Sequence, residues 1–534
     1  MKQYHQRNRA AFFGALLCIL FSNTFAVVLQ FFKGDVLDHA IAGDVHSTIR
    51  YILLLISFIL GEVLFYYLFK RCSANYAAGC TRLLKRNIFG SIVRRSYVDY
   101  LARQQGEYMA KLTNEADAIR DRRFQILPRL FDILSKIAFV SVALFLLDWR
   151  LALITIALLT TPLYVPKLIE KRLQKAQTVY LRAVEANLAR VSDWLRGFEI
   201  IKNFAVEQQI LRAFDESNDL VMERMQKDAA LGAISQLITT LISYLSYFIV
   251  LVFAAWLVLK GRFSAGDFFV AIGMIDQLSY PLISLAETIR QLVAIRPACD
   301  AMVRFCAQGD GAAMKGAALQ GVREGIRYED VSFAYPGAVP ILKHFDLTAK
   351  LGQRILLRGP SGCGKTTAVN LLLRYHDVSG GRITIDEVPL SAYGSTYDCM
   401  TVVRQEAVLF HDTLRNNLTM FRRIPDETLT AMLKELGLSK FATRERLDAL
   451  VAENGANLSG GEKKRICLAR ALLRDTDVLI LDEPLANLDE ATARRIEDLL
   501  LSIRGKLVIV VSHQFSEEKL SRFDRVITMQ AQGA

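Results

Sequence analysis

The chain has 534 residues, 52% of them apolar and 22% charged, and 66 Lys and Arg residues against 54 Asp and Glu residues give a formal net charge of +12. This length is too great for one hydrophobic core, and the composition excludes a disordered chain and an ordinary cytosolic enzyme. A membrane protein with a soluble part fits both observations. The charge indicates either a nucleic-acid surface or basic cytoplasmic loops, so the positions of the charges decide between these classes.

Six apolar stretches in the first half of the chain predict six membrane crossings. The third and fourth are slightly short, and we expect them to form a tight hairpin that turns at 148–150. The N-terminal run also resembles a signal peptide, but it continues past any plausible cleavage site, which favours an uncleaved first helix. The stretches are 12–32, 51–69, 130–147, 151–165, 231–259 and 268–293.

Lys and Arg residues gather in two long connections, 71–123 and 167–227, and are few in the loops on the other side. Because basic loops stay cytoplasmic, both termini are predicted to be cytoplasmic in an integral protein of a bacterial inner or plasma membrane. The basic excess then needs no nucleic-acid partner. The connections contain no helix-breaking run, so we expect helical extensions of the spans that turn back near Gly106 and Gly197.

The composition changes after the last crossing. Residues 306–324 are rich in Gly and Ala, as in a linker, and the remainder alternates short apolar strands, at 354–357, 478–481 and 507–511, with helical stretches. We therefore expect an all-α six-helix transmembrane domain at 1–305, a linker at 306–324 and an α/β domain at 325–534, which the Walker A pattern at 359–367 then makes an α/β P-loop nucleotide-binding domain. The eight scattered cysteines favour free thiols over a disulfide framework.

Residues 359–367, which we call the phosphate loop, match the Walker A pattern G-x-x-x-x-G-K-[ST] between an apolar strand and a helix. Backbone N–H groups of such a loop wrap phosphates, the lysine reaches the β- and γ-phosphates, and the hydroxyl after it binds Mg²⁺. The nucleotide-binding residues predicted here are Gly359, Pro360, Ser361, Gly362, Cys363, Gly364, Lys365, Thr366 and Thr367.

Two further segments carry matching chemistry. The apolar strand 478–481 ends in Asp482 and Glu483, which are expected to hold Mg²⁺ and to polarise an attacking water. Residues 458–462, which we call the signature segment, read LSGGE, and Ser459, Gly460 and Gly461 precede a helix in a second anion-binding arrangement. With these motifs in this order, the whole chain resembles the ATP-binding cassette family, whose signature is LSGGQ.

The resemblance implies roles for four more residues. Tyr335 corresponds to the aromatic residue that stacks on adenine, and Gln405 to the glutamine that contacts Mg²⁺ and the attacking water. Asp489 corresponds to the aspartate of the family's D-loop, and His513 to the histidine that contacts the γ-phosphate. The implied catalytic residues are Glu483, His513 and Gln405, the Mg²⁺ ligands are Thr366, Gln405 and Asp482, and the cofactors are ATP and Mg²⁺.

The chain also departs from the family pattern. Glu462 replaces the signature glutamine, and Asn487 stands where alanine is commoner in the D-loop. Neither change removes a catalytic group. Segments 97–117 and 194–207 resemble the family's two coupling loops, in which short helices would dock on the nucleotide domains.

The resemblance implies an exporter-type half-transporter that works as a dimer, for which we favour two identical chains over a paralogous partner. ATP would lie between the phosphate loop of one chain and the signature segment of the other, and closure would drive alternating access. The expected substrate is a hydrophobic or amphipathic drug, lipid or peptide. An importer of metal chelates on the same fold and a gated channel stay open, whereas the six crossings exclude a soluble ATPase acting on nucleic acid.

Charge is costly within the predicted crossings, and three ionisable residues there are our candidates for the substrate cavity: Glu62, Lys136 and Asp276. At 1.5 Å rise per residue, Glu62 and Lys136 lie at matching depths. They would form either an ion pair or a snorkelling lysine with Glu62 beside a wet cavity. Asp276 is expected at the wall of the translocation cavity.

Overall fold

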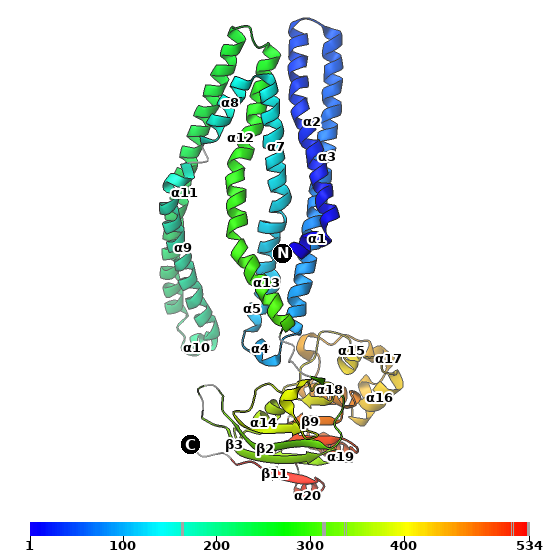
Figure 1. Cartoon of the computed structure of the whole chain (residues 1–534). Helices are drawn as coiled ribbons and strands as arrows, with labels where there is room; N and C mark the ends of the chain where they lie inside the picture. The colour runs from blue at the N-terminus through cyan, green and yellow to red at the C-terminus, as the bar shows by residue number, and fades with distance from the viewer. Residues whose placement is uncertain are drawn as a thin grey trace. The chain divides into compact units, whose positions relative to one another are not determined.

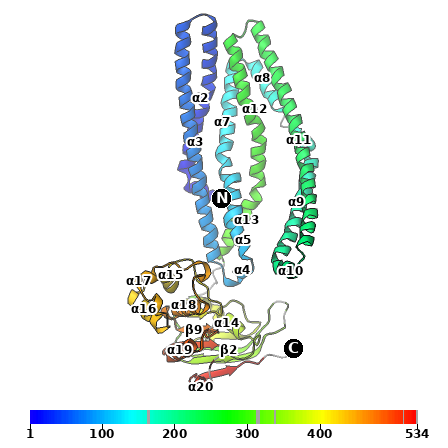
Figure 2. The ribbon, with the colours of Figure 1, turned by 180° about the vertical axis from the view of Figure 1, so that it is seen from behind.

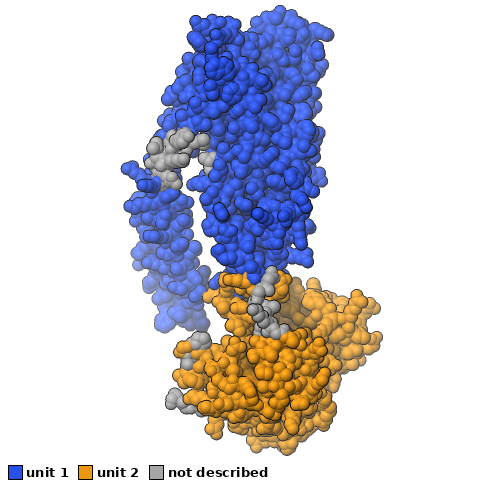
Figure 3. Space-filling view, viewed as in Figure 1, with its two compact units in different colours: residues 1–91, 105–307 blue, residues 92–104, 308–534 orange. Residues whose placement is uncertain are grey.

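The computed structural model describes residues 1–161, 165–311, 317–335, 337, 339–486, 488–513, 515 and 517–530, with the backbone alone at 165–170, 286 and 309–311. The chain forms two compact units (Figure 3). Unit 1 comprises residues 1–91 and 105–307, and unit 2 comprises residues 92–104 and 308–534. The domain boundaries at 305 and 325 stay predictions.

Unit 1 consists of long helices (Figures 1 and 2). Five helical stretches among the described residues are long and apolar enough to cross a membrane: Arg9–Ile41, Val45–Val93, Gln105–Leu147, Glu207–Leu259 and Ala265–Gln308. The helices are α1 (Lys2–Arg7), α2 (Arg9–Ile41), α3 (Val45–Val93), α5 (Gln105–Ala110), η1 (Lys111–Glu115), α6 (Ala116–Ile119), η2 (Arg120–Phe124), α7 (Ile126–Leu147), α8 (Trp149–Leu159), α9 (Val165–Arg196), α10 (Phe198–Asn203), α11 (Glu207–Leu259), α12 (Ala265–Ala294) and α13 (Arg296–Gly311).

The predicted hairpin between the third and fourth apolar stretches is confirmed. Helix α7 ends at Leu147, and the Asp148 carboxylate caps α8 by accepting hydrogen bonds from the Arg150 and Leu151 amides. Such a cap satisfies amides at the start of a helix, where no carbonyl is available. Helix α8 has 11 residues, fewer than a crossing needs, and the predicted stretch continues into residues 162–164, which lie outside the described part.

The two longest described helices of unit 1 are far longer than a bilayer is thick. Helices α3 and α11 have 49 and 53 residues, or about 74 and 80 Å at 1.5 Å per residue. Figures 1 and 2 show α9 running beside α11, and these two helices pack on each other. Helices α2, α7 and α12 pack around a buried apolar cluster that includes Val140, Leu144, Val270, Met274 and Leu278.

The described residues of unit 2 form three sheets. The five-stranded sheet is wholly parallel, in the order β11-β4-β10-β9-β8, and the four-stranded sheet is antiparallel, in the order β3-β2-β5-β6; β1 pairs with β7. The strands are β1 (Ala317–Ala318), β2 (Gly325–Phe333), β3 (Leu342–Lys350), β4 (Arg354–Arg358), β5 (Gly380–Ile385), β6 (Val388–Pro389), β7 (Tyr393–Ser395), β8 (Met400–Val403), β9 (Val478–Asp482), β10 (Leu507–Val511) and β11 (Arg525–Thr528).

All residues of β9 and β10 are buried, as expected for a parallel sheet covered on both faces. The three strands predicted from apolar runs are therefore confirmed as β4, β9 and β10. The helices of unit 2 are α4 (Tyr97–Leu101), α14 (Lys365–Leu372), η4 (Leu390–Ala392), α15 (Leu414–Thr419), α16 (Asp426–Glu435), η5 (Ser439–Phe441), α17 (Arg444–Leu447), η6 (Glu453–Gly455), α18 (Gly460–Leu473), α19 (Glu490–Ser502) and α20 (Glu517–Leu520). No disulfide joins any of the eight cysteines, all of which lie in the described part of the chain.

Candidate functional site

The phosphate loop joins the end of β4 to the start of α14. Gly364 has φ +98°, and a Cβ there would lie 2.7 Å from the Leu342 side chain, so both the backbone and the space require glycine. The Lys365 ammonium is buried and donates hydrogen bonds to the carbonyls of Gly359 and Pro360 at 2.8 and 2.7 Å. The sequence thus fixes a tight loop at a helix N-terminus with a cation inside it, an arrangement suited to phosphate.

Asp482, at the C-terminal end of β9, lies against this loop. Its Oδ2 accepts a hydrogen bond from the Thr366 hydroxyl at 3.3 Å and lies 3.7 Å from Arg404 Nη1. Burial raises the pKa of Asp482, while Arg404 and the Thr366 hydrogen bond act in the opposite direction. A carboxylate and a hydroxyl side by side are hard oxygen donors of the kind that Mg²⁺ prefers.

Glu483 follows at the end of the same strand, and its carboxylate points to the loop after β10. Its Oε1 lies 2.9 Å from His513 Nδ1, and its Oε2 accepts a hydrogen bond from the Ser512 hydroxyl at 3.4 Å. The Glu483 backbone is left-handed, with φ +49°. Two neighbours on one loop therefore orient an acid whose backbone is itself strained.

Lys464 is a residue of this region that the sequence analysis did not select. Its ammonium is buried and donates a hydrogen bond to the Gln405 carbonyl at 3.0 Å. Burial lowers the pKa of Lys464, and the nearby Asp482 and Glu483 carboxylates oppose that shift. In the sequence, Lys464 follows Lys463 at the start of a predicted helix, where both side chains would be expected in solvent. Only the fold shows that Lys464 is buried and Lys463 is not.

One cavity of about 650 Å³ collects most of the predicted residues. We call it the nucleotide cavity. Cys363 is buried and does not line it, and neither do Tyr335, Ser459, Gly460, Gly461 and Asp489. Its lining includes Gly359, Pro360, Ser361, Gly362, Gly364, Lys365, Thr366, Thr367, Gln405, Asp482, Glu483 and His513.

Tyr335 lies beside the antiparallel sheet in an edge-to-face aromatic group. Its ring centroid is 5.0 Å from that of Phe333 and 5.1 Å from that of His376, with interplanar angles of 83° and 86°. Such pairs hold a ring in place through their electrostatic quadrupoles. The contact of Tyr335 with adenine stays a prediction.

The signature segment forms a capping box at the start of α18. The Glu462 amide donates to Ser459 Oγ at 3.3 Å, and the Ser459 amide donates to the Glu462 carboxylate at 2.9 Å. Lys440 forms an ion pair with the same carboxylate at 2.5 Å. Burial acts to raise the pKa of Glu462, but the contacts with Lys440 and Ser459 outweigh it and hold the pKa below its ordinary value. Glutamate and glutamine both suit this position of a capping box, which explains the departure from the family signature.

Asp489 caps the next helix, α19, by accepting a hydrogen bond from the Thr492 amide at 3.0 Å, and this contact lowers the pKa of Asp489. The other departure in the same segment, Asn487, lies outside the described residues.

Two neighbouring cavities with charged residues in their lining lie between the long helices in the described part of unit 1. The first, of about 730 Å³, is lined by Glu62 and Lys136, and the second, of about 560 Å³, by Lys136 and Asp276. Lys136, Tyr280 and Pro281 line both, so we treat the two as one membrane cavity. Within the described part of the chain, Glu62 and Lys136 form no ion pair, so the structure does not contain the first of the two predicted arrangements.

The membrane cavity has further charged residues that the sequence analysis did not select. Lys70, Arg129 and Asp132 also line it. Three cations, Lys70, Arg129 and Lys136, act electrostatically on the Asp132 carboxylate. The amide of buried Asn23 donates to Asp132 Oδ1 at 3.3 Å. Asp132 was detectable in principle, because it lies one helical turn before Lys136 in a predicted crossing.

Two family models match the chain. The model described as the ABC transporter transmembrane region matches residues 12–282, and the model described as ABC transporter matches residues 342–486. The chain belongs to the ABC transporter family. This transporter is therefore an integral membrane protein that binds ATP and couples its hydrolysis to transport, with both functional parts fused in one chain.

Individual relatives agree with this assignment. An ATP-dependent lipid A-core flippase of Chromobacterium violaceum is 26% identical over 454 residues, which are 84% of this chain and 77% of that protein. A candidate multidrug export ATP-binding/permease protein of Bacillus subtilis is 27% identical over 464 residues, which are 84% of this chain and 78% of that protein. The solved structure of a bacterial Atm1-family ABC exporter with ATP bound has a TM-score of 0.80 at 22% identity, covering 98% of this chain and 94% of that chain. The predicted fold class, a helical transmembrane domain followed by a nucleotide-binding domain, is confirmed.

Proposed function

We propose that this transporter exports an amphipathic molecule and that two identical chains bind Mg²⁺–ATP at two shared sites. The observation that carries the proposal is the nucleotide cavity, where Lys365, Asp482 and the paired Glu483 and His513 face one volume. Lys365 supplies a cation for phosphate, Asp482 supplies a ligand for a metal, and Glu483 supplies a carboxylate that can orient water and accept its proton.

Each of the chain's own residues has a distinct task in this proposal. The phosphate-loop amides and Lys365 bind the phosphates, and Glu483 orients the attacking water and accepts its proton. His513 fixes the Glu483 carboxylate through the 2.9 Å contact and reaches the γ-phosphate. Thr366, Asp482 and Gln405 would hold Mg²⁺, which neutralises the charge that develops on the phosphates during transfer.

The signature segment supports a shared site. Ser459 and Gly460 are exposed, and neither lines the nucleotide cavity of their own chain. A second chain would place these residues over the nucleotide. Because this chain has both Glu483 and an intact Ser459-Gly460-Gly461, a homodimer would contain two working sites.

The membrane cavity supports an amphipathic substrate. It combines charged residues, Glu62, Lys136 and Asp276, with aromatic ones such as Tyr66 and Tyr280. A charge that faced lipid would cost about 2.5–3.5 kcal/mol on insertion scales, so a polar ligand or water is its natural neighbour. The names of the relatives, a lipid flippase and a multidrug exporter, agree with this substrate class. Both termini and the nucleotide domain would be cytoplasmic in a bacterial inner or plasma membrane.

Sealed proteoliposomes test the direction of transport. External ATP reaches only the transporters whose nucleotide domains face outward, so export appears as movement of substrate into the lumen. We expect ATP-dependent accumulation of a fluorescent amphipath, or loss of a labelled lipid from the outer leaflet, with the parent chain and not with Glu483→Gln. ATP-driven movement out of the lumen by the same population would contradict export, and single-channel currents would support a channel instead.

A further inference from the structure

We propose that Arg404 is a positioning residue that links the Mg²⁺ carboxylate Asp482 to the aromatic contact holding α4. This inference rests on the proposed nucleotide site. Arg404 directly precedes Gln405 and is not among the site residues that the sequence analysis selected.

The first link is electrostatic. Arg404 Nη1 lies 3.7 Å from Asp482 Oδ2, the oxygen that also accepts the Thr366 hydrogen bond. The Asp482 side chain is only 7% exposed, so water screens this charge poorly, and the arginine supplies positive charge at the carboxylate. A divalent cation on the same carboxylate would repel the guanidinium and weaken the pair.

The second link is a stack of flat groups. The Arg404 guanidinium lies over the Tyr375 ring, 5.3 Å from its centroid, and the Tyr375 ring stacks on Tyr97 with centroids 3.9 Å apart and an interplanar angle of 28°. Tyr97 is the first residue of α4, a five-residue helix capped by Ser96. A planar guanidinium is suited to an aromatic face, and lysine is not an equivalent.

Further contacts keep Arg404 between these two partners. Its Nη2 donates to Asn370 Oδ1 at 2.6 Å, and Asn370 lies on α14, the helix that begins at the phosphate loop. Arg404, Tyr375 and Tyr97 all line one groove of about 700 Å³ in unit 2. The guanidinium therefore has a carboxylate partner and an aromatic partner within reach, and the charge at Asp482 sets the balance between them.

The consequence is a specific response of α4 to the metal. When Mg²⁺ joins ATP at Asp482, Arg404 shifts its interaction toward Tyr375, and the stack on Tyr97 tightens. The amides of 97–101 should then exchange with solvent more slowly in Mg²⁺–ATP than in ATP with a chelator.

Hydrogen exchange of the full-length protein in lipid nanodiscs measures this response, with Glu483→Gln as the background so that ATP persists. We expect Mg²⁺ to slow exchange of 97–101 several-fold in that background and to have little effect after Arg404→Gln. Arg404→Lys keeps the charge but loses the stack and should respond only partly. Protection of 359–367 by ATP reports separately on the nucleotide site.

Matched variants separate this role from a general loss of stability. Tyr375→Phe keeps the ring and should retain the response, whereas Tyr375→Leu keeps the Arg404–Asp482 pair and should lose it. Arg422 lines the same groove and donates to the Arg474 carbonyl at 3.3 Å, so Arg422→Gln is the control for a lost arginine and should retain the response.

Two results would overturn this inference and leave the proposed nucleotide site standing, provided that ATP still protects 359–367. One is a full Mg²⁺ response at 97–101 after Arg404→Gln, and the other is an equal loss after Arg422→Gln. If ATP failed to protect 359–367 in the parent background, the proposed nucleotide site would fall and the inference with it.

Discussion

His513 Nδ1 and Glu483 Oε1 lie 2.9 Å apart, and the two side chains differ sharply in exposure, 62% for the histidine and 11% for the glutamate. The acid is thus held inside the wall of the nucleotide cavity by a residue that reaches it from the solvent side. Through this contact the imidazole controls the orientation of the carboxylate without being buried itself.

Replacing Glu483 by Gln should abolish ATP turnover while preserving ATP binding. The amide has nearly the same shape and can still contact His513, but it cannot accept a proton from water. ATPase rates and ATP affinity of the purified protein test this, with Glu490→Gln as the control because Glu490 is exposed and paired with Arg494. Near-parental turnover of Glu483→Gln would show that another group activates the water.

Ser459→Arg should block hydrolysis while leaving ATP binding largely intact. The long cation would fill the space that the phosphate of a partner chain must enter, whereas the phosphate loop of its own chain is untouched. Ser459→Thr keeps the hydroxyl that caps α18 and serves as the control. Hydrolysis by the arginine variant at the parental rate would exclude a shared site.

Glu462→Ala should lower the free energy of unfolding of the nucleotide domain by about 1 kcal/mol, because half of the capping box is lost. Glu462→Gln keeps the cap and loses only the ion pair with the 64% exposed Lys440, which should cost less than about 1 kcal/mol. Thermal unfolding of both variants would test this, and equal losses would show that the charge, not the cap, matters.

The difference in stability between the parent chain and Glu462→Gln should depend on pH. The folded-state pKa of Glu462 is lowered, so its charged contacts stabilise the fold above the unfolded value of about 4.3 and are lost as the pH falls through the lower folded value. The difference in stability between the parent chain and Glu462→Gln should therefore narrow below about pH 4. A gap that widened on acidification would contradict the direction of this shift.

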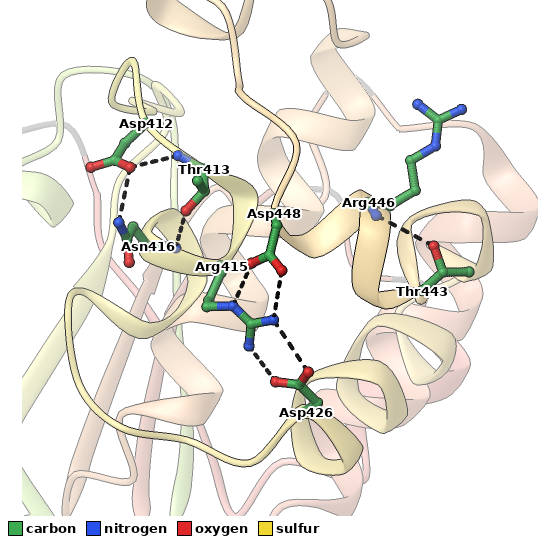
Figure 4. A network of polar contacts seen from close by, with 8 residues as sticks. All are labelled: Asp412, Thr413, Arg415, Asn416, Asp426, Thr443, Arg446 and Asp448. Atoms are coloured by element: carbon green, nitrogen blue, oxygen red, sulfur yellow. Dashed lines mark hydrogen bonds and ion pairs between the residues drawn. The ribbon is translucent and has the colours of Figure 1, made fainter.

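Arg415→Met should loosen the helices between the phosphate loop and the signature segment. Figure 4 shows the Arg415 guanidinium between two carboxylates, with Nε 2.7 Å from Asp448 Oδ1 and both terminal nitrogens toward Asp426. These contacts tie α15 to α16 and to the end of α17. Hydrogen exchange of 426–435 should increase several-fold.

Arg446→Met is the matched control for Arg415→Met. Figure 4 shows the Arg446 side chain pointing away from the carboxylates, and the contact drawn for it is a backbone one, from its amide to the Thr443 hydroxyl at 3.4 Å. If both substitutions increased exchange equally, the Asp426 and Asp448 contacts would carry no special stabilisation.

Asp276→Ala should change the ratio of substrate-stimulated to basal ATPase activity. The carboxylate is exposed in the membrane cavity beside Lys136 and Tyr280, where a substrate would touch it. A panel of cationic, zwitterionic and anionic amphipaths provides the measurement, with Glu287→Gln on the same helix as the control because Glu287 is paired with Arg290. An unchanged profile across the panel would make Asp276 structural.

The sequence predicted those features that depend on neighbouring residues. The phosphate loop, the Asp482-Glu483 pair and the signature segment are contiguous patterns, and the strands before them are short apolar runs. What it missed depends on contacts between distant segments. Arg404 and Asp482 are 78 positions apart, and Lys464 finds Gln405 only when α18 packs beside β8.

The order of the strands and the pairing of the charged residues in the membrane could not be predicted from local patterns, because both depend on contacts between distant segments. Strand β4 lies between β10 and β11, which follow it by more than 140 residues, and no periodicity encodes that pairing. Glu62 and Lys136 were matched by depth, but depth along two helices does not fix which faces meet. The structure places both at one cavity without pairing them.

The left-handed backbone of Glu483 has a consequence for which residue selection retains at this position. A non-glycine residue with φ +49° carries a conformational cost of about 1–2 kcal/mol, which glycine or asparagine would relieve. Drift under selection for stability alone would therefore move this position away from glutamate. That glutamate stands there, nearly buried and tethered to His513, is the mark of a position kept for chemistry at the expense of stability.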